Sequence, residues 1–216
     1  MTDAERALEA ITTAFPPTLA QELRSELLQR TPNESRRVHV LGVEGMAVTL
    51  AEQWGLDAHA CLIAALLHDL AKNDPKDEQR RKLGACTLFP PTDDDLDSPA
   101  IWHGLIAAQE GHDRYGIRHR SVLEAVAYHP TGADGLDEIG LTLFVADFIE
   151  PSRSWPGVEN ARRSFMAMDC RDAATAVAQH KLSFLRAKGR TIHPRTRAML
   201  QWLGAETPDP VDSHTG

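Results

Sequence analysis

Residues 62–72 read Leu-Ile-Ala-Ala-Leu-Leu-His-Asp-Leu-Ala-Lys, an apolar run that one imidazole and one carboxylate interrupt. The run predicts a helix that is apolar on every side and therefore buried. His68 and Asp69 would lose their hydration in such a helix, which costs free energy unless another group compensates them. A metal ion is the compensation that we expect, and its remaining ligands must come from neighbouring helices.

Other ligands of this centre are expected in similar apolar helical settings, and the candidates are His39, His103, His129 and Asp147. Adjacent residues of a helix point about 100° apart, so His68 and Asp69 can flank a metal that lies between their helix and its neighbours. Asp69 has two carboxylate oxygens and can bridge two metals. Imidazoles and carboxylates without thiolates suit iron, manganese, cobalt or zinc. Two such ions about 3.5 to 4 Å apart commonly activate water against phosphorus.

The spacing of apolar residues and the helix boundary signals predict an all-α chain. Pro16-Pro17 divides the first stretch into two helices, Asn33 and Asp57 precede helices, and Pro130 ends one. The acidic cluster at 93–97 is typical of a solvated surface loop. We expect helices at 4–30 in two parts, 34–54, 58–72, one short helix within 73–97, 99–115, 121–129, 141–150, 158–168, 171–187 and 194–203.

The chain has 216 residues and a formal net charge of −8, which predicts one domain and argues against a general binder of nucleic acids or anionic membranes. Three cysteines without a CxxC motif favour a reducing compartment. We find neither a secretory signal nor a membrane span of roughly 18 apolar residues, and therefore expect a cytoplasmic protein. Within the domain we expect an N-terminal helical cover (1–30), a core (31–155), C-terminal helices (156–204) and a disordered tail (205–216).

Five stretches of the chain carry a family resemblance. They are Arg36–Val43, Ala64–Lys72, Trp102–Gly104, Ala125–Gly132 and Ala146–Arg153, and they follow one another in the family's order. On these stretches the chain resembles the HD-domain metal-dependent phosphohydrolases, and among them the symmetrical bis(5'-nucleosyl)-tetraphosphatases, which hydrolyse diadenosine tetraphosphate. A His-Asp pair alone is weak evidence, whereas six ligands in order and the motif Ala-Asp-Phe-Ile-Glu-Pro-x-Arg are specific. The resemblance implies an HD-domain helical fold with extra short helices at both ends.

The resemblance also implies how two divalent metals share the ligands, with iron expected and manganese or cobalt as alternatives. One metal would be held by His39, His68, Asp69 and Asp147, and the second by Asp69, His103 and His129. The family usually has threonine where Pro130 stands. This departure leaves open only the fine geometry of the turn after His129.

The implied activity is hydrolysis of a phosphoanhydride in a nucleotide substrate. A hydroxide held between the metals would attack one phosphorus of diadenosine tetraphosphate, and cleavage would yield two ADP molecules. Lys72 would contact the non-reacting phosphates through its single ammonium charge, and Arg153 through two parallel N–H groups of its guanidinium. The expected catalytic residues are therefore Asp69, Lys72 and Arg153, and the expected substrate contacts are Lys72, Thr131, Arg153 and Arg36.

Three alternatives stay open from the sequence. The same centre could hydrolyse another nucleotide, such as a nucleoside monophosphate, a cyclic nucleotide or an alarmone, because the sequence does not resolve the base and phosphate pockets. A di-iron centre on a helical HD scaffold can also activate oxygen, as in inositol oxygenase. A non-catalytic nucleotide sensor would keep the fold, although such modules usually lose one or more metal ligands. The sequence also leaves open whether the chain forms a homodimer.

Overall fold

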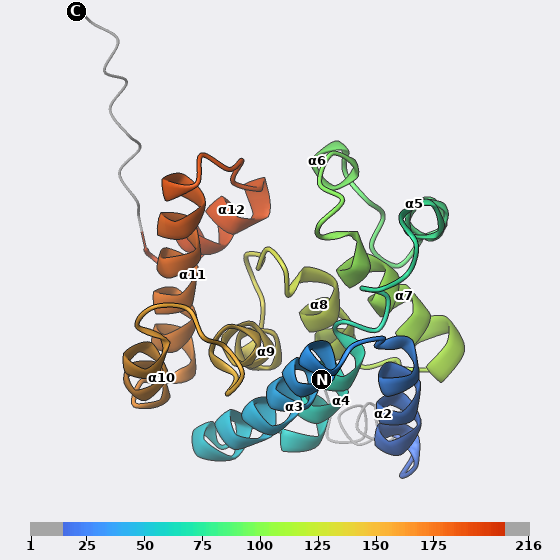
Figure 1. The fold of residues 1–216 in the computed structure, drawn as a ribbon, viewed down its shortest axis with the longest axis horizontal. Coiled ribbons are helices and arrows are strands. Elements are labelled where there is room, and N and C mark those ends of the chain that lie inside the picture. Colours follow the sequence, from blue (N-terminus) through green and yellow to red (C-terminus); the bar gives the residue numbers. More distant parts are fainter. Residues whose placement is uncertain (1–14, 206–216) are drawn as a thin grey trace, which may run out of the picture.

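The computed structural model describes residues 15–205, and within this range the chain is helical and has no β-strand (Figure 1). The helices are α2 (Leu19–Arg30), α3 (Glu34–Trp54), α4 (Ala58–Leu67), α5 (Lys76–Gly84), α6 (Asp93–Leu96), α7 (Trp102–Tyr115), α8 (Arg120–Tyr128), α9 (Glu138–Ile149), α10 (Val158–Met166), α11 (Cys170–Ala187) and α12 (Pro194–Trp202). The all-α prediction is confirmed. The helix expected before Pro16-Pro17 lies outside the described residues, and so do residues 206–216 of the tail expected at 205–216.

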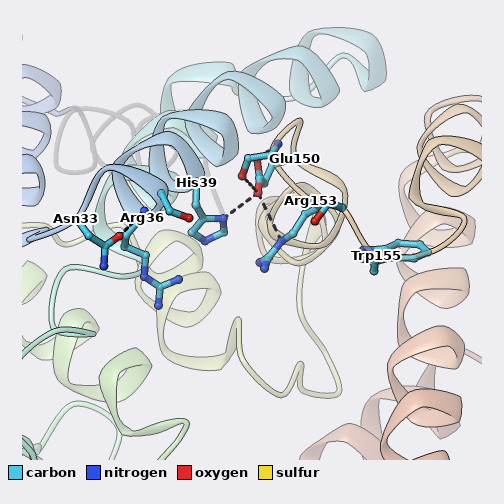
Figure 2. A pocket seen from close by; sticks show the side chains of 9 residues that line it. Asn33, Arg36, His39, Glu150, Arg153 and Trp155 are labelled. Atoms are coloured by element: carbon cyan, nitrogen blue, oxygen red, sulfur yellow. Dashed lines mark hydrogen bonds and ion pairs between the residues drawn. The ribbon is translucent and has the colours of Figure 1, made fainter.

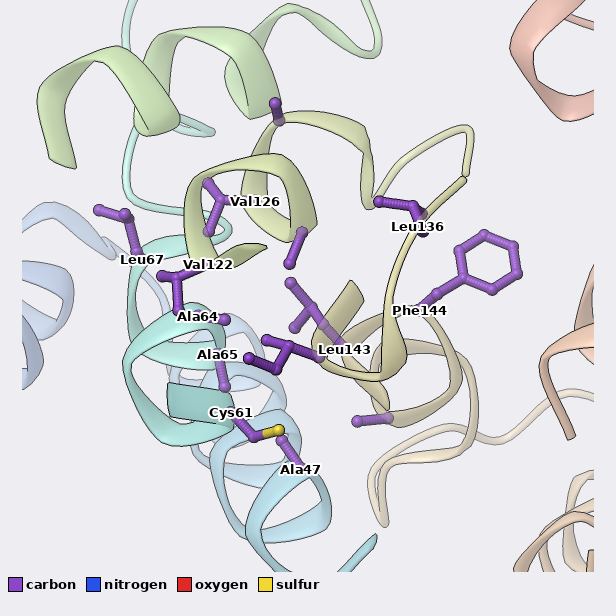
Figure 3. Packing of buried hydrophobic residues seen from close by; sticks show 14 of the residues in the cluster. Ala47, Cys61, Ala64, Ala65, Leu67, Val122, Val126, Leu136, Leu143 and Phe144 are labelled. Atoms are coloured by element: carbon purple, nitrogen blue, oxygen red, sulfur yellow. The ribbon is translucent and has the colours of Figure 1, made fainter. Parts of the chain in front are cut away.

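The apolar helix α4 lies at the centre of the fold and packs against α2, α3, α7, α8 and α9. Figure 3 shows its small side chains Cys61, Ala64 and Ala65 among apolar residues of the neighbouring helices, and each of the three is at most 1% exposed. Small side chains let several helices approach α4 closely and exclude water from it. None of the helices within 15–205 has both the length and the apolar composition required to cross a lipid bilayer.

Helix α4 ends at Leu67, so the prediction of one continuous helix to Lys72 is wrong. The N–H of His68 still bonds the carbonyl of Ala64 at 3.0 Å, but the N–H of Lys72 bonds the carbonyl of Asp69, only three residues back, at 3.0 Å. The backbone therefore leaves the α-helix in tight turns. As a result, the His68-Asp69 pair stands at the end of the central helix, where side chains from several other helices can reach it.

Helices α3 and α9 pack against each other and against α4, and each begins at a capping residue. The side chain of Asn33 accepts a hydrogen bond from the N–H of Arg36 at 2.8 Å, and that of Asp137 accepts two from the first turn of α9. Helix α3 ends at Gly55, whose φ of 69° few residues other than glycine adopt. Local signals thus place the two helices that carry His39 and Asp147.

The acidic stretch at 93–97 is not the solvated loop that we expected. It forms the short helix α6, and the side chain of Asp95 is fully buried. Both carboxylate oxygens of Asp95 accept hydrogen bonds from the guanidinium of Arg195, one of them at 2.7 Å, and Thr92 donates to the same group at 2.8 Å. The indole of Trp102 donates to the backbone carbonyl of Asp95 at 2.7 Å. These bonds attach α12 to the segment that precedes α7.

We expect Asp95→Asn to lower the free energy of unfolding at pH 7 by about 3 kcal/mol, because it leaves the half-buried Arg195 guanidinium without its counter-charge. Burial raises the pKa of the Asp95 carboxyl, but Arg195 and Thr92 outweigh burial and lower this pKa from 3.8 to about 2. A folded-state pKa below the unfolded-state value stabilises the protein above about pH 4, and this contribution is lost as the pH falls toward about 2.

Urea unfolding between pH 7 and pH 2 measures both effects. The Asp95→Asn variant should lose less stability than the wild type between about pH 4 and pH 2, because one carboxyl no longer titrates. Asp93→Asn is the matched control, since Asp93 is exposed in the same helix. An Asp95→Asn variant with the acid dependence of the control would contradict the buried ion pair.

Candidate metal centre

The six predicted ligands lie together, although they come from distant parts of the sequence. His39 lies on α3, His68 and Asp69 follow α4, His103 is in the first turn of α7, His129 follows α8 and Asp147 is near the end of α9. Asp147 is half-buried, and the other five are between 0% and 6% exposed. The fold therefore gathers the whole predicted set into one nearly enclosed cluster.

The carboxylate of Asp69 stands in the middle of four imidazoles. Its Oδ1 lies 3.2 Å from Nε2 of His103 and 3.7 Å from Nε2 of His129. Its Oδ2 lies 3.6 Å from Nε2 of His68 and 3.7 Å from Nε2 of His39. Each oxygen has its own pair of imidazoles, which is the arrangement expected of a carboxylate that bridges two metals. The two pairs are those that the resemblance assigns to separate metals, and this assignment stays a prediction.

Hydrogen bonds at the far side of the rings determine which nitrogen carries the proton. Nδ1 of His68 lies 2.6 Å from the carbonyl oxygen of Ala65, and Nδ1 of His129 lies 2.8 Å from that of Val126. A carbonyl oxygen only accepts, so Nδ1 is the donor in both rings and Nε2 carries a lone pair. Nε2 of His68 is buried and has no hydrogen-bond partner among residues 15–205. A metal ion would satisfy this lone pair.

The imidazole of His103 presents a lone pair as well. Nε2 of His103 lies 3.1 Å from Nε2 of His129 and 3.0 Å from Nζ of Lys72, an ammonium that can only donate. Two nitrogen lone pairs at this distance repel each other unless positive charge lies between them. Ligand atoms within 4.8 Å of one another form two sets in the described part of the chain: His39, His68 and Asp147, and His68, Asp69 and His129. Donors of this kind fit divalent metals.

The protonation states also suit metal binding. Burial lowers the pKa of His68 to about 4 and that of His103 to about 3. Burial alone would raise the pKa values of the Asp69 and Asp147 carboxyls. Nearby groups outweigh burial and lower both pKa values, and the largest of these effects comes from His68 at Asp69 and from Arg153 at Asp147. At neutral pH the imidazoles of His68 and His103 are therefore neutral and the two carboxylates ionised, which are the forms that ligate metals.

Sequence reasoning did not identify Glu150 as part of the centre. Its side chain is fully buried, and Oε1 accepts a hydrogen bond from Nδ1 of His39 at 3.0 Å (Figure 2). Ser152 donates to the same carboxylate through its N–H and its hydroxyl, both at 2.6 Å. Burial lowers the pKa of His39, but Asp69 and Glu150 outweigh burial and raise it. A carboxylate that is hydrogen-bonded to an imidazole fixes the orientation of the ring, so we predict that Glu150 positions His39.

We expect Glu150→Gln to weaken metal binding by about tenfold, because glutamine keeps an acceptor oxygen for His39 but removes the negative charge behind the ring. Competition for manganese with a chelating dye measures this affinity. Glu52→Gln is the control, since Glu52 is exposed on α3, the helix that carries His39. If Glu150→Gln binds manganese as tightly as this control, Glu150 does not position the ligand.

Three cations surround the ligands. Nη1 of Arg36 lies 3.4 Å from Oδ2 of Asp69, Nζ of Lys72 lies 3.9 Å from Oδ1 of Asp69, and Nη2 of Arg153 lies 2.6 Å from Oδ1 of Asp147. Arg36 and Arg153 line a cavity of about 500 Å³, and Figure 2 shows them on either side of His39. An anionic ligand that enters this cavity therefore meets two guanidinium groups beside the predicted metal ligands.

The turn after His129 is held by bonds within the chain. The N–H of Gly132 bonds the carbonyl of residue 128 at 2.7 Å, and the hydroxyl of Thr131 donates to the carbonyl of Gly132 at 2.8 Å. The hydroxyl of Thr196 on α12 donates to the carbonyl of Thr131 at 2.8 Å. Thr131 is 5% exposed and is not among the residues that line the cavity of about 500 Å³. Its role as a substrate contact stays a prediction, and no contact in the structure supports it.

Comparison with known protein families agrees with this site. Residues 36–201 match the HD domain family, and all six predicted ligands lie within the match. The match spans well over half of the chain. The chain therefore belongs to the HD-domain family.

Two relatives of the chain carry the same enzyme name. The symmetrical bis(5'-nucleosyl)-tetraphosphatase of Bacillus subtilis (strain 168) is 32% identical over 175 residues, which are 79% of this chain and 90% of that protein. The enzyme of the same name from Halalkalibacterium halodurans is 31% identical over 182 residues, 82% of this chain and 94% of that protein. The crystal structure of a predicted HD superfamily hydrolase involved in NAD metabolism from Clostridium acetobutylicum superposes with a TM-score of 0.78 at 26% identity, covering 87% of this chain and 97% of that one. The expected fold and family are confirmed.

Proposed function

We propose that this protein hydrolyses diadenosine tetraphosphate symmetrically into two ADP molecules at a centre of two divalent metals. The observation that carries the proposal is the convergence of four imidazole nitrogens on the two oxygens of Asp69. The relatives named symmetrical bis(5'-nucleosyl)-tetraphosphatases support the choice of substrate. The complete ligand set favours an enzyme over a sensor that merely keeps the fold.

The proposed ligands are divided between the two metals as the family resemblance implies. His39, His68, Asp69 and Asp147 would hold one, and Asp69, His103 and His129 the other. Two bound metals lower the pKa of water that attacks phosphorus and neutralise the charge that develops in the transition state. Imidazole and carboxylate donors without thiolates suit iron, and manganese or cobalt as substitutes. Glu150 would keep the His39 ring oriented toward its metal.

The three cations would position the polyphosphate. Arg36 and Arg153 each lie within 3.4 Å of a carboxylate oxygen that the proposal assigns to a metal. A carboxylate that ligates a metal attracts a guanidinium less strongly, so the N–H groups of both arginines become available to phosphate oxygens. An arginine grips a phosphate through two parallel hydrogen bonds, whereas Lys72 supplies a point charge.

Product analysis tests the proposal. Manganese-loaded or iron(II)-loaded protein is incubated with diadenosine tetraphosphate, and the nucleotides are separated by anion-exchange chromatography. We expect ADP as the only product, loss of turnover after chelation of the metal, and recovery when metal is added back. ATP plus AMP would contradict symmetrical cleavage. A protein that binds metal and does not turn this substrate over would contradict the proposed substrate.

A further inference from the structure

A second cavity of about 370 Å³ lies beside the proposed active site, and the proposed function assigns it no role. Its lining includes Pro130, Phe148, Trp155, His180, Lys181 and Phe184. Ligand pockets commonly have volumes of about 300 to 1,000 Å³ and apolar, aromatic walls with a few polar groups. This cavity has both properties.

Aromatic rings form much of its wall. The ring centroids of Trp155 and His180 lie 4.5 Å apart with their planes at 44°, and Phe148 lies 5.1 Å from Trp155 and 5.2 Å from His180. Phe184 follows His180 by one helical turn on α11, so both side chains lie on one face of that helix. Phe184 is 51% exposed, which is unusual for so large an apolar side chain. Rings arranged in this way offer stacking surfaces to a flat aromatic ligand.

The cavity with aromatic walls adjoins the larger cavity of about 500 Å³ beside the predicted metal ligands. Trp155 lines both this cavity and the larger one that Arg36 and Arg153 line, and Figure 2 shows it beyond Arg153 at the edge of the larger cavity. Two further wall residues are the immediate neighbours of predicted metal ligands, since Phe148 follows Asp147 and Pro130 follows His129. We call the cavity of about 500 Å³ with Arg36 and Arg153 the cationic cavity, and that of about 370 Å³ the aromatic cavity. Side by side, they match the two parts of a nucleotide, its phosphates and its base.

Two side chains of the wall carry hydrogen-bond donors that the described part of the chain does not fully satisfy. Nε1 of Trp155 is buried and has no hydrogen-bond partner in the described part of the chain. Nζ of Lys181 donates to the carbonyl of Pro130 at 3.1 Å and lies 4.3 Å from the ring centroid of Phe144. An ammonium has three donors, so this bond leaves Lys181 able to donate to a second acceptor. Purine rings carry acceptor nitrogens at their edges.

We infer that the aromatic cavity binds the adenine of one ADP half of the substrate, with its phosphates in the cationic cavity. This inference rests on the proposed function, because only a nucleotide substrate brings a base to the metal centre. Two other cavities in the described range share no lining residue with either of these and do not fit this role.

Calorimetric titration of the manganese-loaded protein with ADP and, separately, with pyrophosphate tests the inference. We expect Phe184→Ala and His180→Ala each to weaken ADP binding by about fivefold or more, because each removes a stacking surface, and to leave pyrophosphate binding unchanged. Both side chains are exposed on α11, so neither change creates a hole in the buried hydrophobic core. Gln179→Ala is the matched control, since Gln179 is exposed on the same helix and does not line the cavity.

The outcomes separate the base site from the proposed function. ADP affinity equal to that of the control in both variants would overturn the inference, and so would an equal loss of ADP and pyrophosphate binding. A wild type that fails to cleave diadenosine tetraphosphate contradicts the proposed function. A selective loss of ADP binding in the variants supports the base site even in that case.

Discussion

Asp69→Asn should reduce the turnover of diadenosine tetraphosphate by more than about 100-fold while the protein stays folded. Loss of a partner that only orients a metal ligand already costs about 10- to 100-fold in metal affinity or activity, and Asp69 stands between all four imidazoles. Asparagine has nearly the same shape but no charge, and its amide nitrogen cannot ligate a metal. Initial rates with a fixed metal concentration, together with the metal content of the purified variant, measure the effect.

The control for this change is Asp77→Asn, because Asp77 is an exposed carboxylate in the first turn of α5. Thermal unfolding of both variants establishes that they are folded. The Asp69 variant should bind fewer than two metal equivalents, whereas the control should match the wild type in metal content and turnover. An Asp69→Asn protein with two bound metals and more than about a tenth of the wild-type turnover is incompatible with a bridging role.

The predicted ligands could be selected from the sequence because imidazoles and carboxylates are conspicuous in apolar helices. The same apolar pattern did not indicate where α4 ends. The run continues through Leu70 and Ala71, both at most 1% exposed, so its composition does not reveal that the helix ends at Leu67. Burial of this segment against its neighbours decides its backbone conformation, and helix propensity does not report such contacts.

The structure also differs from the sequence predictions at Glu150 and Asp95, and in both cases the bonding partner is distant in the sequence. Glu150 bonds His39, which is 111 residues away, and Asp95 bonds Arg195, which is 100 residues away. A carboxylate in a polar stretch gives no local sign that the fold will bury it. One feature of the sequence could have identified Glu150. It follows Asp147 by three residues, about one helical turn, so its side chain lies on nearly the same side of the chain as that of Asp147.

Gly42→Ala should weaken metal binding by about 10- to 100-fold, although residue 42 is not itself a predicted metal ligand. Gly42 lies three residues after His39 on α3, and a Cβ there would come closer than 3.0 Å to Oε2 of Glu150. Glu150 is fully buried and is held by His39 and Ser152, so it cannot move aside without breaking these bonds. We also expect the free energy of unfolding to fall by about 1 to 3 kcal/mol from overpacking.

Gly45→Ala separates this effect from helix propensity. Gly45 lies on the same helix, and a Cβ there would meet no atom within 4 Å. Alanine should therefore raise the free energy of unfolding by about 0.5 to 1 kcal/mol and leave metal affinity unchanged. If Gly42→Ala acts by displacing Glu150, its effect on metal affinity must overlap with that of Glu150→Gln, so the double variant should lose less than the product of the two single losses. If the loss of metal affinity in the double variant equals the product of the two single losses, the alanine at position 42 acts on the centre independently of Glu150.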